Sequence, residues 1–280
     1  DLHRRRHSFP TDALPIYLCR SFNSLTWSAG INYATAGWIL KANIGKSFRV
    51  PIPKELGTDG VNYHIFRYEK GNPNLNPEES YQLDAGIHWG NDRLTIQFDP
   101  YLNYFPNYIY MNPTPNYYEG LQWYYCTQSR VIRCGFELQA DWKILPSLSA
   151  EFKGEYLYAE QLSGEKKGYT LPFSTPWSAD ATLRYAFCRK NVGNEGFVAM
   201  NLHVTGRQNN IVPPEKPTPG YYTLNLTAGK DFAFGERTLR LSLNAENLLN
   251  RKYYDHTSFY RLIDVPEPGR NVALMATFEF

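Results

Sequence analysis

Apolar and polar residues alternate with a period of two along most of the chain from Leu25 onward. Between Tyr81 and Trp89, for example, every odd position is apolar or aromatic and the even positions are Gln, Asp, Gly and His. Residues 132–144 and 271–280 alternate in the same way. A strand places successive side chains on opposite faces, so this period predicts β-strands. We count about eleven of them, and no helical period competes.

The connections between the predicted strands alternate between short and long. The short ones fall near 34–37, 90–93, 145–147, 188–197 and 233–238, and the long ones near 49–80, 105–131, 159–176, 207–221 and 248–271. A transmembrane β-barrel has tight turns at one end and long loops at the other. The alternation therefore predicts an all-β, antiparallel transmembrane barrel.

The two faces of the predicted strands differ in charge. The apolar face carries no charge at its central positions, whereas the opposite face holds Lys41, Asp84, Asp99, Glu137, Asp141, Glu151, Lys153, Asp180, Arg184 and Arg240. A Lys or Arg facing lipid at mid-bilayer costs roughly 2–4 kcal/mol. Aromatic residues gather at strand ends, as in the girdles of such barrels: Tyr33, Trp38, Trp89, Tyr104, Trp142, Tyr158, Trp177, Tyr222 and Phe232. A soluble antiparallel sheet also alternates, but it does not explain long loops at one end only.

Composition adds little to this prediction. The net charge of the 280 residues is +2, and 16% of them are aromatic. No run of 18 apolar residues exists, so no membrane-spanning helix is predicted. The four cysteines show neither metal-type nor redox-type spacing. There is no basic stripe for nucleic acid, and no cofactor is indicated.

The first twenty residues differ from the rest. Residues 1–20 are rich in Arg and Pro and share no pattern with the remainder of the chain. We expect them to be a non-native segment derived from adapter DNA, and we place the barrel domain at 21–280.

Four motifs stand in order at strand boundaries. Phe48–Arg49–Val50–Pro51 closes one strand and the segment 71–80 opens the next. The segment 247–253 follows the penultimate strand, and 268–271 precedes the last, which ends at Phe280. This series resembles the barrel domain of TonB-dependent outer-membrane receptors. The matching positions, for which we expect structural roles, are Phe48, Arg49, Pro51, Gly71, Asn72, Pro73, Pro77, Glu78, Asn247, Asn250, Tyr253, Gly269, Arg270 and Phe280.

The resemblance implies a larger assembly. The family's barrel has 22 strands around an N-terminal plug, so about eleven strands would be its C-terminal half, with the plug absent from this chain. The implied location is the outer membrane of a Gram-negative bacterium. The implied partners are the TonB complex, through the plug, outer-membrane lipid, and the barrel-assembly machinery at the last strand. External loops would bind a scarce nutrient, and TonB would remodel the plug to admit it.

Within the family, the segments 60–64 and 256–271 are most similar to receptors for metals: zinc first, then ferric siderophores and haem. The candidate substrate-binding residues are Tyr63, His64, Trp123, His256, Tyr260 and Arg261. His64 and His256 are also the candidate metal ligands, because imidazole binds transition metals. His88 and His203 lie on the polar face and would line the lumen.

Three other functions remain possible from the sequence. A passive porin has the same alternation but lacks the four motifs. A carbohydrate-importing receptor of the same superfamily would need an aromatic platform for sugar in its loops. An enzyme is disfavoured, because the chain has no GxSxG or similar signature.

Overall fold

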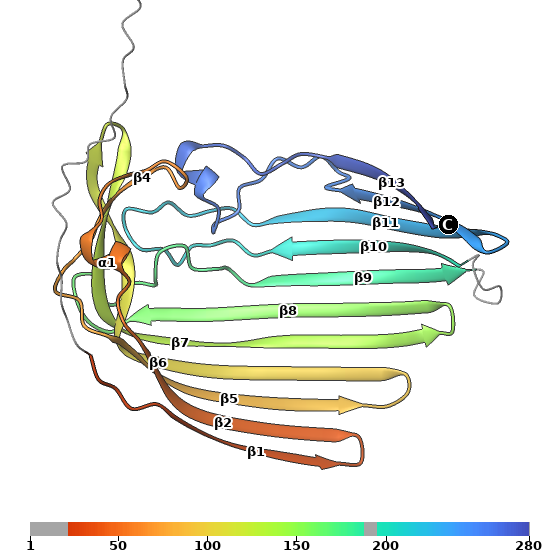
Figure 1. The fold of residues 1–280 in the computed structure, drawn as a ribbon, viewed down its shortest axis with the longest axis horizontal. Helices are drawn as coiled ribbons and strands as arrows, with labels where there is room; N and C mark the ends of the chain where they lie inside the picture. Colours follow the sequence, from red (N-terminus) through yellow and green to blue (C-terminus); the bar gives the residue numbers. More distant parts are fainter. Residues whose placement is uncertain (1–21, 188–194, 280) are drawn as a thin grey trace, which may run out of the picture.

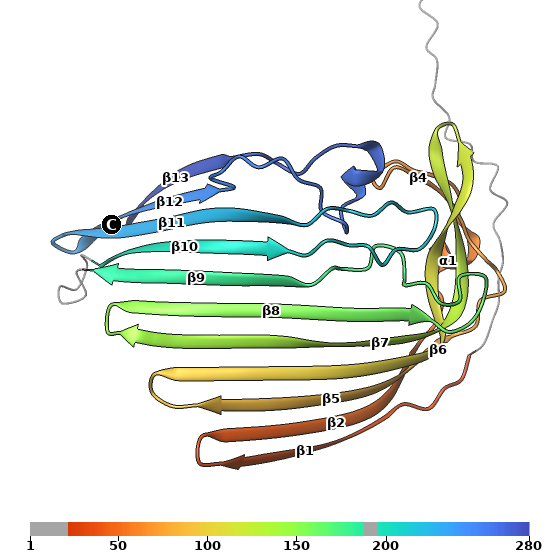
Figure 2. The same ribbon diagram turned by 180° about the vertical axis from the view of Figure 1, so that it is seen from behind.

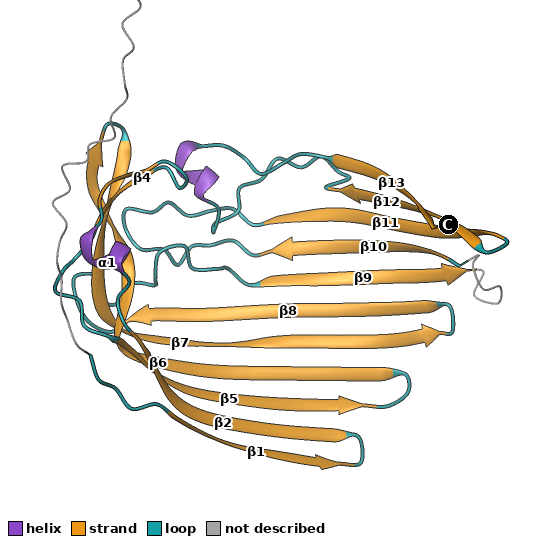
Figure 3. Cartoon of the chain, in the orientation of Figure 1, coloured by secondary structure: helices purple, strands orange, loops and turns teal. Residues whose placement is uncertain are grey.

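The structure, a computed structural model, describes residues 22–187 and 195–279. Figure 3 shows a chain built almost entirely of strands and loops. Its strands are β1 Trp27–Thr35, β2 Trp38–Arg49, β3 Asp59–Asn62, β4 Arg67–Lys70, β5 Glu78–Gly90, β6 Leu94–Tyr118, β7 Leu121–Leu145, β8 Leu148–Gln161, β9 Ser178–Phe187, β10 Gly196–Thr205, β11 Tyr221–Phe234, β12 Arg237–Glu246 and β13 Asn271–Glu279. Its helices are α1 Pro53–Gly57 and the 3-10 helix η1 Phe259–Ile263.

One sheet contains all thirteen strands. Its path runs β1-β2-β5-β6-β7-β8-β9-β10-β11-β12-β13, and each neighbouring pair is antiparallel. β3 and β4 lie off this path, where β4 pairs with β7 in parallel. Figures 1 and 2 show the eleven strands of the path as a curved wall. The predicted all-β barrel architecture is thus confirmed, with about eleven strands on the wall.

The strand register confirms the two predicted faces. Directly opposed residues share a face, and one row across five strands is polar: Gln97, Gln139, Lys153, Asp180 and His203. The neighbouring row on the other face is apolar: Ile96, Ala140, Phe152, Ala181 and Leu202. Many large side chains of the apolar face are exposed, among them Leu183, Leu202 and Leu274. An exposed apolar face suits a wall surrounded by lipid.

The predicted tight turns lie at one end of the wall. β1 and β2 are joined through Ala36 and Gly37, whose φ angles are +41° and +82°. Two consecutive positive φ angles match the right-handed twist of a two-residue hairpin. Trp38 and Trp89 of the predicted girdle meet at this end, with ring centroids 6.3 Å apart. The predicted turn at 188–197 falls mostly outside the described residues, as do residues 1–20 and Phe280.

The predicted loop at 105–131 is wrong. β6 and β7 continue through this region as a hairpin of two 25-residue strands, joined only by Glu119 and Gly120. Prolines at 106, 113 and 115 interrupt the alternation, and register shifts between 105 and 108 and between 113 and 117 accommodate them. In Figures 1 and 2 the far part of this hairpin turns away from the wall and runs across the ends of the other strands.

The buried core lies at this loop end of the molecule. One cluster contains Phe105, Val131, Ala159 and Leu171, and a second contains Leu75, Ile109 and Cys126. Both join the β6–β7 hairpin to the segments that cover it. Neither helix in the described part of the chain has the length and apolar character needed to cross a membrane.

Several motif residues fix the ends of loops. The Arg49 guanidinium binds Glu78 at 3.1 Å and Glu55 at 2.9 Å, which ties β2 to α1 and β5. A Cβ added at Gly71 would lie 2.8 Å from the backbone nitrogen of Gly57, so only glycine fits there. Asn250 accepts a hydrogen bond from the backbone N–H of Arg270 at 3.0 Å.

Candidate ligand-binding site in the loops

Side chains from distant segments meet at the loop end in one aromatic and cationic cluster, here called the loop hub. It comprises Arg67 of β4, Tyr124 of β7, Phe173 of the β8–β9 loop, and Phe259 and Arg261 of η1. The Arg67 guanidinium lies 4.6 Å from the centre of the Tyr124 ring and 5.7 Å from that of Phe259. Phe173 packs edge-on against Phe259 at 5.1 Å, and Arg261 lies 5.4 Å from the Phe173 ring.

Two aromatic residues in the left-handed backbone region contact η1. Phe66 has φ +54° and contacts Tyr260 at 5.9 Å between ring centres. Phe173 has φ +56° and contacts Phe259. An aromatic residue in this conformation costs about 1–3 kcal/mol and persists only where its surroundings hold it. The backbone at Phe66 and Phe173 is therefore held by its surroundings, which include η1.

A buried ionic cluster lies beside the loop hub. Glu215, in the β10–β11 loop, binds the Arg261 guanidinium at 3.4 Å and the backbone N–H of Phe173 at 3.1 Å. His256 Nδ1 lies 2.7 Å from the Thr218 hydroxyl, and its Nε2 lies 3.9 Å from Glu215 Oε2. The side chains of Glu215 and His256 are each 1% exposed. This cluster joins three loops.

Burial shifts the pKa values of this cluster in opposite directions. Loss of water raises the pKa of Glu215, because the carboxylate form is disfavoured. Burial, with the nearby Arg261 charge, lowers the pKa of His256 to about 4. His256 is therefore neutral at pH 7.

A second buried carboxylate anchors β4 below the loop hub. Glu69, with a side chain 1% exposed, accepts hydrogen bonds from Arg67 at 2.6 Å, Lys54 at 2.7 Å and Asn62 at 3.1 Å. Burial alone would raise its pKa, but these three donors outweigh burial and hold the pKa below its usual value.

The loop hub borders a cavity of about 360 Å³. The wall contributes Arg133 and Leu157, and the β6–β7 hairpin contributes Tyr108 and Tyr110. The lining also includes Arg67 of β4, Phe173 and Thr257 of the loops, and Phe259 of η1. The cavity thus combines two guanidinium groups with phenol and phenyl rings, a set that can bind an anionic, aromatic or oxygen-rich ligand.

The predicted site residues fall into several places. Tyr63 and His64 are exposed and line a second cavity of about 400 Å³ beside the edge of β3. Trp123 packs against Tyr68 at 5.3 Å, at the base of the hairpin tip. Arg261 belongs to the loop hub, Tyr260 contacts Phe66, and His256 is buried against Thr218.

The two predicted metal ligands do not share a cavity. His64 lies at the exposed tip of the β3–β4 hairpin, whereas His256, in the β12–β13 loop, is buried against the β10–β11 loop. Within the described residues, no group of three or more His, Cys, Asp and Glu side chains is arranged to hold a metal ion.

Sequence reasoning missed most residues of the loop-hub cavity, namely Arg67, Tyr108, Tyr110, Arg133 and Phe173. Arg133 could have been identified from the sequence, because its position in the alternating segment 132–144 puts it on the charged face. Arg67 and Phe173 carry no such signal, since Arg67 lies in a strand of only four residues and Phe173 in a loop.

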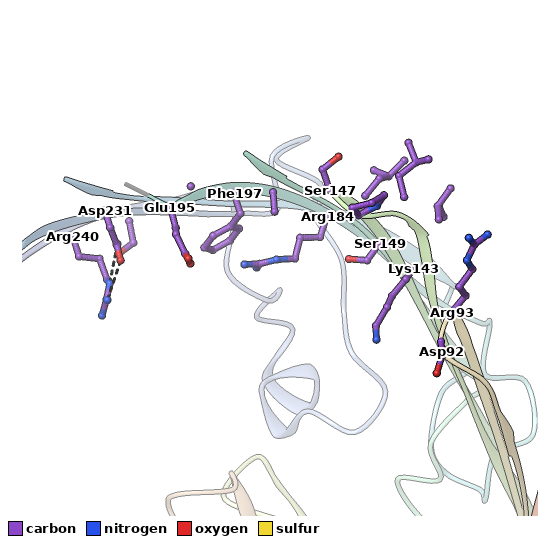
Figure 4. Close-up of a pocket in the computed structure, with 18 residues that line it drawn as sticks. Asp92, Arg93, Lys143, Ser147, Ser149, Arg184, Glu195, Phe197, Asp231 and Arg240 are labelled. Atoms are coloured by element: carbon purple, nitrogen blue, oxygen red, sulfur yellow. Dashed lines mark hydrogen bonds and ion pairs between the residues drawn. The ribbon is translucent and has the colours of Figure 1, made fainter. Parts of the chain in front are cut away.

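The concave face of the wall carries two further cavities. The larger, of about 830 Å³, lies at the turn end, where Figure 4 shows Lys143, Arg184 and Glu195 pointing to the concave side. The smaller, of about 400 Å³, is lined by Asp99, Glu137, Lys153, Glu155, Asp180 and His203, among others. His88 and His203 lie on this face as expected, bonded to Asp99 at 2.7 Å and Asp180 at 3.1 Å.

A match to a known protein family identifies the kind of protein to which this curved sheet belongs. A family model described as "TonB dependent receptor-like, beta-barrel" matches residues 7–248. The chain belongs to the TonB-dependent receptors. Members of this family are outer-membrane receptors of Gram-negative bacteria. The tight turns are thus periplasmic, the loops extracellular, and the concave face lines the lumen.

Solved structures of this family share the fold. The copper transporter OprC superimposes with a TM-score of 0.70 at 20% identity, covering 88% of this chain and 38% of its own. The FrpB iron transporter of Neisseria meningitidis gives 0.62 at 16% identity, covering 90% and 38%. BauA, the ferric preacinetobactin receptor of Acinetobacter baumannii, gives 0.65 at 14% identity, covering 91% and 36%. The chain therefore spans well under half the length of these receptors.

Proposed function

We propose that this TonB-dependent receptor imports a metal chelate carrying negative charge, such as a ferric siderophore, and that the chelate binds in the loop-hub cavity. The observation that supports this proposal is the pair of guanidinium groups, Arg67 and Arg133, facing a cavity also lined by Tyr108, Tyr110 and Phe259. The proposed partners remain the TonB complex, outer-membrane lipid and the barrel-assembly machinery.

The two arginines differ in their freedom to bind a ligand. Arg67 is ion-paired with Glu69 at 2.6 Å, so its charge is largely compensated. The Arg133 side chain makes no ion pair or hydrogen bond with any described residue, and it is half-buried on the lumen wall. A guanidinium group binds planar carboxylate or catecholate oxygens with two donors. Arg133 is therefore the residue we expect to contact an anionic chelate directly.

A chelate fits this cavity better than a bare metal ion does. Capture of a free ion requires several His, Cys, Asp or Glu ligands that converge. The cavity instead provides arginine, tyrosine and phenylalanine side chains. The copper and iron transported by OprC and FrpB agree with a metal cargo in general. Family membership argues against a passive porin.

Two chelates of different charge test this proposal. In receptor-containing outer-membrane vesicles, quenching of tryptophan fluorescence would be titrated with an anionic ferric catecholate and with a neutral ferric hydroxamate. We expect Arg133→Gln to weaken binding of the anionic chelate about tenfold, the value of one charge-assisted hydrogen bond. Binding of the neutral chelate, if any, should not change.

Arg184→Gln is the matched control, because Arg184 lies on the same wall but lines the turn-end cavity. It should leave binding of both chelates unchanged. Equal losses in the two arginine variants, or no loss with Arg133→Gln, would show that the loop-hub cavity does not bind the anionic chelate.

A further inference from the structure

One fully buried side chain fixes the hydrogen bonding of a tyrosine in the loop-hub cavity. Gln161, at the end of β8, is 0% exposed. Its Nε2 donates to the carbonyl oxygen of Thr170 in the β8–β9 loop at 2.7 Å, and its Oε1 lies 2.5 Å from the hydroxyl of Tyr110 on β6. Gln161 therefore joins the β6–β7 hairpin to the β8–β9 loop.

The direction of both hydrogen bonds follows from the Thr170 carbonyl. A carbonyl oxygen only accepts, so the Gln161 amide must present its nitrogen to Thr170 and its oxygen to Tyr110. An amide oxygen also only accepts, so the Tyr110 hydroxyl donates its single hydrogen to Gln161. Rotating the amide by 180° would place its oxygen against the Thr170 carbonyl. Only the observed arrangement satisfies both bonds.

The Tyr110 oxygen is left with the role of acceptor. A phenol has one hydrogen, and that of Tyr110 is already donated to Gln161. The oxygen can therefore bind another group only through its lone pairs. Burial raises the pKa of Tyr110, so the phenol keeps its hydrogen at pH 7.

The Tyr110 hydroxyl lies at the border of the cavity. Tyr110 is half-buried and belongs to the lining. Ala159, two positions before Gln161 on the same face of β8, and Leu171, directly after Thr170, also line the cavity. The hydroxyl is thus bonded between two segments that border the ligand space.

The other polar groups of this cavity have different hydrogen-bonding roles. A guanidinium group such as that of Arg133 only donates. The Tyr108 hydroxyl makes no hydrogen bond with any described residue, so it can both donate and accept. A ligand that binds Arg133 and Tyr110 together therefore needs an anionic group for the first and a hydrogen-bond donor for the second.

We propose that Tyr110 is a specificity-determining residue, which selects among anionic metal chelates those that carry a hydroxyl or amide N–H group. An ether oxygen at the same place would face the Tyr110 oxygen with no hydrogen between two acceptors. The inference rests on the proposed function, because the chelate has to bind in the loop-hub cavity. It deepens that function by naming a second group on the chelate.

Two chelates that differ by a single hydrogen-bond donor test this selection. The ferric complexes of hydroxymethylcatechol and of methoxymethylcatechol have the same charge and the same iron-binding groups, but only the first has a free hydroxyl. Quenching of tryptophan fluorescence in receptor-containing outer-membrane vesicles would give both affinities. We expect the hydroxyl chelate to bind about fivefold more tightly, the value of one neutral hydrogen bond.

Two variants change the role of the Tyr110 oxygen. Tyr110→Phe removes the acceptor and should reduce the ratio of the two affinities to about one. Gln161→Met keeps the Tyr110 hydroxyl but frees its hydrogen, which can then bind the ether oxygen, so the ratio should again fall to about one. A merely structural role of either residue would weaken both chelates alike and leave the ratio unchanged.

Gln161→Glu is the matched control, because its side chain still offers Tyr110 an acceptor, and the ratio should stay at about fivefold. Tyr108→Phe removes a hydroxyl that can both donate and accept, so it should weaken the two chelates equally. If Gln161→Met prevents assembly of the receptor, Tyr110→Phe decides alone.

An affinity ratio of about one in the wild type, or a ratio of about fivefold that persists in Tyr110→Phe, would overturn the selection. The proposed function stands in both cases if Arg133→Gln still weakens binding of the two chelates. If Arg133→Gln weakens binding of neither chelate, the proposed function fails, and the selection by Tyr110 fails with it.

Discussion

Acidic–basic pairs lie both beside the loop hub and on the lumen wall, but they differ greatly in their exposure to water. In the pair Glu215–Arg261 beside the loop hub, the side chains are 1% and 11% exposed. In the pair Asp231–Arg240 on the wall, they are 24% and 52% exposed. Removing one partner of a buried pair leaves an uncompensated charge, whereas water compensates an exposed one. Breaking the pair beside the loop hub should therefore cost much more free energy than breaking the pair on the wall.

The largest effect is expected from breaking the buried pair. Glu215→Ala removes the partner of Arg261 and an acceptor of the Phe173 N–H, and should destabilise the closed arrangement of the loops by about 3–5 kcal/mol. Hydrogen exchange should accelerate more than about a hundredfold at amides of 206–220 and 247–270, without loss of protection in β9–β12. Unchanged exchange in both loops would mean that the pair does not hold them together.

Protonation of the buried His256 imidazole is expected to have the second largest effect on the stability of the loops. The pKa of His256 is about 4, below its usual 6.5, so its contribution to loop stability is complete above pH 6.5 and is lost as the pH falls toward 4. The loss should approach about 3 kcal/mol, since each pKa unit corresponds to about 1.4 kcal/mol.

Hydrogen exchange of the same loops between pH 7 and pH 4.5, corrected for the intrinsic rate, measures this loss. Glu215 changes the stability of the loops in the opposite direction. Burial raises its pKa, so protonation at low pH removes the cost of a buried negative charge. The difference between the wild type and His256→Gln isolates the histidine contribution. A difference that stays constant with pH would contradict it.

The smallest effect is expected on the wall. Asp231→Ala breaks two hydrogen bonds to Arg240, of 3.0 and 3.1 Å, in a pair that water reaches. We expect a change of at most about 1 kcal/mol in the free energy of unfolding of the barrel, measured by denaturant titration. A loss of stability as large as that expected for Glu215→Ala would show that the pair on the wall is no more tolerant of change than the pair beside the loop hub.

The strands and their faces could be predicted from the sequence because they obey a local rule. A strand repeats every two residues, so the segment 132–144 alone assigns Glu137 and Asp141 to one face and Leu138 and Trp142 to the other. The rule fails where prolines interrupt it, which is why the far part of the β6–β7 hairpin was predicted as a loop. Its strands are instead stabilised by β4 and by the buried cluster around Leu75.

The candidate site follows no local rule. Phe173 and Glu215 are 42 positions apart and come together only because the β8–β9 and β10–β11 loops contact each other. Arg261 was predicted as a ligand-binding residue, and that role remains a prediction, although the structure shows its charge bound to Glu215. His256 was predicted as a metal ligand from its place in a loop. Its burial depends on Thr218 and Glu215, which the sequence alone does not connect to it.

The 25-residue strands of the β6–β7 hairpin are more than twice as long as the bilayer requires, since about 9–11 residues cross it. The surplus is an arm on the order of 50 Å long, at about 3.4 Å per residue, and the register shift beside Phe105 lies near its start. Adding two residues to each strand of the arm would keep every side chain on its face and move the tip outward by about 7 Å. The reach of the arm over the loop end can thus change in steps of two residues, while the part of the barrel in the membrane stays unchanged.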